Sequence, residues 1–243
     1  MKSNASRPSL GIMVAALLFL PASLVAQSGL SHLRVVRLSY VSGTVAVKRA
    51  HSSEWAKAMV NTPIEEGFAV STSANSYAEV EFENGSTARL GELPKVDFSQ
   101  LAMDAEGNKI NRLTCDQGYA TFHFVPEHKD VYTVKVADAP ITPNGRSEFR
   151  TDFNRSHLRV AVFGGSVEVA APTGSAQLGK DKVLEYNTQS TEEAFNIQNG
   201  SGKDSWDKWV DARDKQSQLG LKGQAVSAHG PLYGWSDLGA DDP

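Results

Sequence analysis

Three glutamates at every second position are the residues of this chain whose type and spacing best suit chemistry. Glu79, Glu81 and Glu83 alternate with apolar residues in the segment 77–83. A glycoside hydrolase uses two carboxyl groups held across a cleft, one of them with a raised pKa. Glutamates that point the same way from one strand more often form a solvated face that protects a sheet edge. We expect the second role, with a carbohydrate- or cell-wall-processing enzyme as the lesser alternative.

Histidines and acidic turn residues offer little for a metal site. The six histidines are dispersed along the chain: His32, His51, His123, His128, His157 and His229. His123 and His128 flank one turn but lack the arrangement of a zinc site. The segment 104–108, Asp-Ala-Glu-Gly-Asn, has no bidentate glutamate at the spacing of a calcium loop, and a hairpin turn explains it. We therefore expect no metal and no cofactor.

Nucleophile and nucleotide motifs are missing from the sequence as well. It contains no Gly-x-Ser-x-Gly, no phosphate loop and no Gly-x-Gly-x-x-Gly. The single cysteine, Cys115, precedes Asp116, whose charge has the wrong sign for activating a thiolate. We expect Cys115 to be a small buried hydrophobic residue. The sequence thus predicts no catalytic residues and a protein that is not an enzyme.

The N-terminal segment has the three parts of a secretory signal. Two basic residues precede the apolar run 10–20, and a stretch of mostly small residues follows Pro21. Leu24 is larger than the −3 position of a cleavage after Ala26 prefers. A retained membrane anchor is the alternative, but it needs roughly 20 apolar residues and the run is interrupted. We expect residues 1–26 to be a signal peptide, with no stable membrane span unless it is retained, and a periplasmic or secreted protein.

Composition narrows the choice of partners. The formal charge of the 243-residue chain is −4, and removal of residues 1–26 takes it to −6 because two basic residues are lost. A mildly acidic and evenly mixed chain has no electrostatic footprint for nucleic acid or for an anionic membrane surface. A single cysteine leaves an exported domain without a disulfide framework, so its core must hold it together.

A repeated motif indicates the architecture. The pattern Gly-x-Val-x-Val occurs at 43–47 and again at 165–169, each time at the start of a short strand. From residue 33 to 197 the sequence reads as short strands separated by Gly, Pro and Asn turns. This predicts a mainly β domain over 33–197, a β-sandwich or short β-roll built from two related halves. Strands are expected, among others, at 96–103, 109–115, 118–125, 131–136 and 157–163.

One hairpin has a register that can be predicted by parity. A two-residue Asn-Gly loop would place Arg89 opposite Val80, on the apolar face of the strand. A three-residue loop ending at Gly85 pairs Val80 with Ala88 and sets Arg89 against Glu79 on the solvent side. We predict the longer loop, because burying an unpaired arginine costs several kcal/mol. It requires Gly85 in the left-handed conformation.

The C-terminal region 199–243 has a different sequence pattern from the β-region before it. Residues 204–218 are expected to form a helix that Asp204 or Ser205 caps and that ends near Gly220, followed by a flexible tail. The interaction candidates of this region are Trp206, Trp209, Arg213 and Trp235. The two helical tryptophans share a face. They either dock the helix onto the β-structure or form an exposed aromatic pair that engages a protein or glycan.

An ordered set of motifs resembles the FecR domain of bacterial envelope proteins. Besides the two Gly-x-Val-x-Val copies, the set comprises Trp55, Ile64-x-x-Gly67-x-x-Val70, Ala78-x-Val80-x-Phe82-x-Asn84-Gly85, Gly118-x-Ala120-x-Phe122 and Thr142-Pro143-x-Gly145. It covers about 36–186. The helix and tail are similar to those of an exported subset of this family. One departure is 147–150, where the family has a Gly-Thr turn, so the strand pairing there is left open.

The resemblance implies an exported, non-enzymatic FecR-like domain that binds an envelope protein or glycan in envelope sensing or signalling. Better-known members are membrane-spanning regulators that control a sigma factor through a cytoplasmic segment. Only nine residues precede the apolar run here, so direct sigma-factor control is not expected. The alternative is a structural cell-envelope or polysaccharide-associated assembly protein, anchored by its tryptophan helix and tail.

Overall fold

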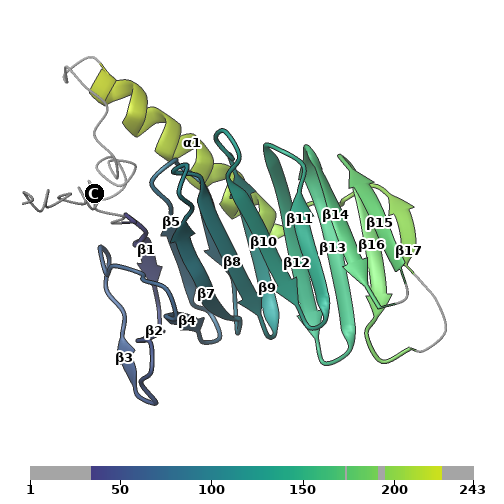
Figure 1. Cartoon of the computed structure of the whole chain (residues 1–243), viewed down its shortest axis with the longest axis horizontal. Helices are drawn as coiled ribbons and strands as arrows, with labels where there is room; N and C mark the ends of the chain where they lie inside the picture. The colour runs from purple at the N-terminus through teal and green to yellow at the C-terminus, as the bar shows by residue number, and fades with distance from the viewer. Residues whose placement is uncertain (1–33, 173, 191–194, 226–243) are drawn as a thin grey trace, which may run out of the picture. The chain divides into compact units, whose positions relative to one another are not determined.

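Two β-sheets packed face to face and one long helix make up the computed structural model (Figure 1). The structure describes residues 34–172, 174–190 and 195–225, and all of these belong to one compact unit. The expected signal peptide and Trp235 lie outside the described residues. None of the helices in the described ranges has the length and apolarity needed to span a membrane.

The first sheet has eight strands, all of whose neighbours pair antiparallel. In spatial order they are β1 (Arg37–Ser42), β5 (Tyr77–Glu81), β6 (Thr87–Leu90), β9 (Gly118–Phe124), β12 (Ser147–Asn154), β13 (His157–Gly164), β16 (Lys182–Asn187) and β17 (Asn196–Asn199). The segment 147–150, whose pairing was left open, therefore belongs to β12 in the middle of this sheet, between β9 and β13.

The second sheet has nine strands, of which only β8 and β10 pair in parallel. In spatial order they are β15 (Gly174–Gly179), β14 (Ser166–Ala171), β11 (Ala139–Pro143), β10 (Val131–Val136), β8 (Lys109–Cys115), β7 (Lys95–Met103), β4 (Ala69–Thr72), β2 (Val45–Lys48) and β3 (Trp55–Lys57). The chain changes sheet after every one to three strands. The predicted mainly β fold of stacked sheets with a C-terminal helix is confirmed.

The two Gly-x-Val-x-Val copies occupy equivalent places. Gly43 and Gly165 have φ angles of 73° and 68°, and each lies where the chain leaves the eight-stranded sheet for the nine-stranded one. A Cβ atom at Gly165 would lie 2.1 Å from the carbonyl oxygen of Arg146, so only glycine fits this crossing. The valines that follow point into the core from β2 and β14, which are separated by five strands.

One apolar core fills the space between the sheets. Its centre is aromatic, and the rings of Phe124 and Tyr132 stack with their centroids 4.4 Å apart. Cys115 is fully buried and unpaired, as predicted. Burial, with Asp116 beside it, raises the pKa of its thiol to about 12, so the thiolate is disfavoured. The cysteine therefore serves as a packing residue.

The predicted hairpin register is confirmed, but the predicted exposure of its polar face is wrong. Val80 pairs with Ala88 and Glu79 with Arg89, and Gly85 has a φ angle of 76°. Glu79 and Arg89, however, are each only 1% exposed. Helix α1 covers this part of the sheet, as the contacts below establish (Figure 1). The alternating pattern thus separates two buried environments, one apolar and one ionic.

Helix α1 (Ser205–Ala225) begins with a reciprocal cap. The backbone N–H of Asp207 donates to Oδ1 of Asp204 at 3.1 Å, and the N–H of Asp204 donates to Oδ2 of Asp207 at 3.0 Å. This arrangement satisfies N–H groups that the first helical turn leaves without intrahelical partners. The helix continues past Gly220, where the sequence suggested its end, because an internal glycine costs a helix only about 1 kcal/mol.

Candidate functional site

A row of four polar side chains crosses the outer face of the eight-stranded sheet. Cross-strand pairing places Glu79 of β5 beside Arg89 of β6, Arg89 beside Thr121 of β9, and Thr121 beside Arg150 of β12. Residues on either side of each position point into the core instead, because side chains alternate along a strand. The row is therefore fixed by the same registers that build the core.

The first half of the row forms a four-membered ionic cluster with helix α1. Nε of Arg89 lies 2.5 Å from Oε2 of Glu79, and Nη2 of Arg89 lies 2.7 Å from Oδ1 of Asp214. Arg213 donates to Oε1 of Glu79 at 3.0 Å, and the hydroxyl of Ser39 donates to the same oxygen at 2.7 Å. Two residues of the sheet and two of the helix thus neutralise one another, and all but the half-buried Asp214 are buried.

The electrostatics of this cluster argue against general acid chemistry at Glu79. Burial acts to raise the pKa of the Glu79 carboxyl, but the guanidinium groups of Arg89 and Arg213 and the hydroxyl of Ser39 together lower it to about 2. A carboxyl that donates a proton near neutral pH needs a pKa shifted the other way. Glu79 stays ionised and serves as an acceptor for its cationic neighbours.

The other two glutamates of the same segment are also paired. Glu81 lies 2.8 Å from Nη2 of Arg37 in β1, and Glu83 forms an ion pair with Nε of Arg34. The predicted solvated row of glutamates is therefore wrong, since each carboxylate is bound by an arginine from a neighbouring segment. The function of the alternating acids is to join β5 to β1, β6 and helix α1.

The second half of the row holds the first turns of the helix. The indole N–H of Trp206 donates to Oγ1 of Thr121 at 2.9 Å. Nη1 of Arg150 lies 2.8 Å from Oδ2 of Asp204 and 3.1 Å from Oδ2 of Asp207. The two aspartates that cap the helix thus also bind it to the sheet.

The helical tryptophans face the sheet. Trp206 is 5% exposed, and its ring lies 4.8 Å from that of Trp209 and 5.2 Å from that of Tyr119. Trp209 is half-buried and also contacts Tyr40, at 5.5 Å between centroids. Arg213 is 4% exposed. Of the residues expected to mediate interactions, these three thus lie at the contact between helix and sheet, which favours the docking alternative.

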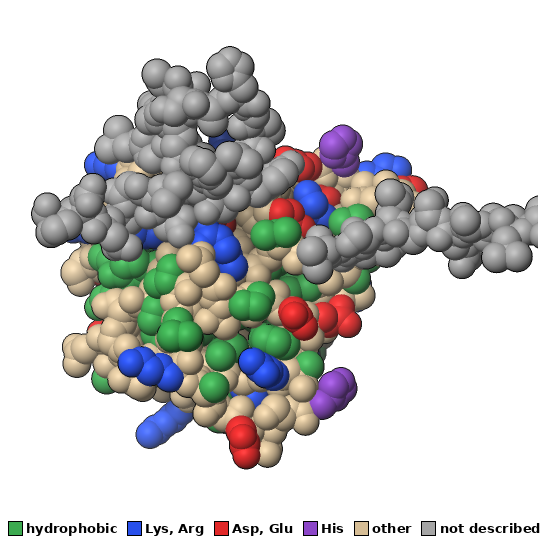
Figure 2. All heavy atoms as spheres, turned by 90° about the vertical axis from the view of Figure 1, so that its left-hand side faces the viewer, with side chains coloured by type: hydrophobic (Ala, Val, Ile, Leu, Met, Phe, Trp, Pro, Cys, Tyr) green, Lys and Arg blue, Asp and Glu red, His purple; other side chains and the backbone are tan. Residues whose placement is uncertain are grey.

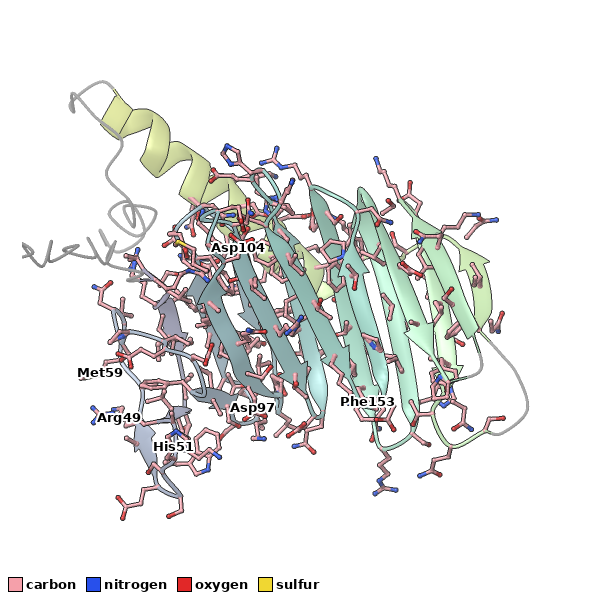
Figure 3. The ribbon with its side chains drawn as sticks, in the orientation of Figure 1. Arg49, His51, Met59, Asp97, Asp104 and Phe153 are labelled. Atoms are coloured by element: carbon pink, nitrogen blue, oxygen red, sulfur yellow. The ribbon has the colours of Figure 1, made fainter. Side chains whose placement is uncertain are left out.

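A hollow lies at the end of the molecule that carries the β6–β7, β8–β9 and β12–β13 turns. It encloses about 670 Å³ and is lined by apolar side chains, Leu93, Tyr119 and Phe153, between charged residues that include Glu92 and Arg155. Figure 3 shows Phe153 at this end of the ribbon. Nothing in the sequence pattern predicted this hollow, because its lining comes from three separate turns and the strand ends beside them.

The turn and histidine residues considered for metals are placed apart. The carboxylate of Asp104 accepts the backbone N–H groups of Glu106 and Asn108 at 3.0 and 2.8 Å, so it organises the β7–β8 turn. His123 lies on β9 and His128 in the next turn. Within the described part of the chain, no three His, Cys, Asp or Glu side chains are grouped to hold a metal ion.

The fold and this helix-covered face define a mainly β, two-sheet protein whose polar outer face is closed by its own C-terminal helix. Residues 68–168, from the start of β4 into β14, match the protein-family model described as FecR protein. The predicted resemblance to the FecR domain is therefore confirmed over these residues. No curated protein matches its sequence.

Two solved structures resemble this fold, both of a protein from Parabacteroides distasonis that is described as a proposed anti-sigma factor. The first is 17% identical with a TM-score of 0.47, and the match covers 63% of this chain and 64% of that one. The second is 16% identical with a TM-score of 0.47, over 64% and 72% of the two chains. This chain thus spans less than two thirds of the length of the first structure.

Proposed function

We propose that this protein is an exported, non-enzymatic regulator of envelope signalling whose FecR domain binds a protein partner. The observation that carries the proposal is the pairing of Glu79, Glu81 and Glu83 with arginines. The residues best suited to catalysis are used to hold the structure together. A FecR domain fits a regulatory role of this kind, and export rests on the N-terminal sequence.

We assign the partner to the hollow lined by Leu93, Tyr119 and Phe153. Leu93 is 52% exposed, and its φ angle of 65° is left-handed, which costs a non-glycine residue about 1–2 kcal/mol. It also precedes Pro94, so its backbone is restricted further. A strained, exposed apolar residue at the rim of a concave apolar surface is typical of a binding site.

Replacing Leu93 with aspartate tests this assignment. The variant introduces a charge into the apolar hollow, so we expect it to lower the yield of cross-linked partner from envelope extract by about tenfold or more. Its free energy of unfolding should stay equal or rise slightly, because aspartate tolerates the left-handed conformation better than leucine. Cross-linking yield and urea unfolding measure the two effects.

Ile197→Asp is the matched control. Ile197 is 46% exposed on β17, an edge strand of the eight-stranded sheet, and receives the same new charge. It should leave the yield unchanged. Equal yields from Leu93→Asp and wild type would contradict the assignment of the hollow. A folded wild-type protein that retains no partner would contradict the binding function itself.

A further inference from the structure

A group of three exposed apolar side chains lies at the edge of the nine-stranded sheet where β2 and β3 are found. Trp55 is 42% exposed, Met59 68% and Val60 43%. The described residues include seven large hydrophobic side chains with this degree of exposure, and three of them fall within the six residues 55–60. Clustering of this kind marks an interaction surface, whereas scattered exposed apolar residues need no explanation.

Basic side chains surround this group. Strand register places Trp55 opposite Lys48 and Lys57 opposite Ala46, on the side of β2 away from the buried Val47. Nζ of Lys48 lies 5.6 Å from the centroid of the Trp55 ring. Figure 3 shows Met59, Arg49 and His51 along the same outer end of the molecule, and Figure 2 faces this end, where apolar side chains lie among basic ones and a few acidic ones.

The charge of this edge differs in sign from that of the whole protein. Segment 45–60 contains Lys48, Arg49 and Lys57 against the single acid Glu54, a formal net charge of +2 with histidine neutral, whereas the chain as a whole carries −4. Overall composition therefore hides a local cationic surface. Its complement is an anionic partner.

We propose that this edge, with Trp55, Met59 and Val60 along it and Lys48, Arg49 and Lys57 on the same two segments, docks on the surface of an anionic lipid bilayer. Tryptophan is enriched in the headgroup region of a membrane, because its ring is amphipathic. Apolar side chains inserted beside basic residues that contact anionic headgroups are typical of proteins that lie on a membrane without spanning it.

A protein strand is a poorer occupant for this edge. β3 has only three residues and carries a lysine, two features that blunt an edge against pairing with another strand. Met59 projects with two thirds of its surface free, which suits insertion between headgroups better than filling a pocket. The proposal does not depend on the proposed partner hollow, which is lined by residues of other turns.

An environment-sensitive fluorophore attached to the full chain at Met59→Cys tests the docking. Cys115 is fully buried, so the label reacts at the new surface thiol. The same label at Ile197→Cys, at the opposite end of the sheets, is the matched control. The probes are phosphatidylcholine vesicles with and without phosphatidylglycerol. The label at position 59 should shift its emission to the blue with the anionic vesicles, and the label at 197 should not.

Charge reversal and added salt test whether the docking is electrostatic. Lys48→Glu, Arg49→Glu and Lys57→Glu together should lower the vesicle-bound fraction of the label at 59 by about tenfold or more, because each basic residue contributes to attraction by anionic lipid. Raising the salt to 1 M shortens the Debye length to about 3 Å and should weaken binding of the unreversed protein. Unchanged folding of the triple variant is checked by circular dichroism.

Three results would overturn the proposal. The first is an emission of the label at 59 that does not change with anionic vesicles. The second is an equal shift of the labels at 59 and 197, which indicates adsorption through another segment. The third is a shift of the label at 59 without lipid as the protein concentration rises, which indicates that the edge contacts a second copy of the chain.

Discussion

Replacing Arg89 with leucine is expected to lower the free energy of unfolding by about 3–5 kcal/mol. Arg89 is 1% exposed and bridges Glu79 of the sheet to Asp214 of helix α1. Leucine would leave both carboxylates without this cation. Removing one partner of a buried ion pair is costly because the remaining charge can no longer be solvated. Urea unfolding of the variant and the wild type at pH 7 measures the difference.

The same substitution at an exposed arginine separates this effect from the loss of arginine as such. Arg112 lies on the uncovered face of the nine-stranded sheet, where its guanidinium binds Gln100. Arg112→Leu should change the free energy of unfolding by no more than about 0.5 kcal/mol. If Arg89→Leu costs no more than Arg112→Leu, the buried ionic cluster does not stabilise the fold in the way its geometry indicates.

The second large effect is expected at Trp206. Trp206→Ala should destabilise the protein by about 3–5 kcal/mol, the usual cost of emptying a buried tryptophan site. The substitution removes the ring stacked on Trp209 and packed on Tyr119, and it leaves the hydroxyl of Thr121 without its indole donor. Urea unfolding measures the loss, and circular dichroism should show reduced helix content if α1 detaches first.

Trp55→Ala is the control for this prediction. Trp55 is 42% exposed at the sheet edge, so its removal should cost about 0.5 kcal/mol or less. A Trp206 variant as stable as the Trp55 variant would mean that helix α1 is held by other contacts, or that it is not closely packed in solution.

Much of the β-structure could be predicted from the sequence, since alternation and turn residues are local signals. The register of the hairpin followed from parity once the loop length was chosen. The environment of Arg89 did not follow, because alternation separates two faces of a strand without saying what covers the polar one. The residues that cover this polar face come from helix α1, in which Asp207 and Asp214 lie on the same side as the apolar residues.

The hollow and the basic edge could not be predicted for a different reason. The φ angle of Leu93 is set by the turn that joins two sheets, and a leucine before a proline gives no sign of it. Trp55 was visible as a motif residue, but only the register of β2 and β3 shows that it stands beside Lys48 at a sheet edge. Both surfaces arise from tertiary packing.

A double-mutant cycle between Glu79 and Arg213 tests most directly the central claim, that the acidic strand joins helix α1 to the sheet. The two side chains are 3.0 Å apart across the contact between helix and sheet, and both are buried. Unfolding of Glu79→Gln, Arg213→Gln and the double variant should give a coupling energy of about 1–3 kcal/mol at pH 7. A coupling energy below about 0.3 kcal/mol would contradict the claim.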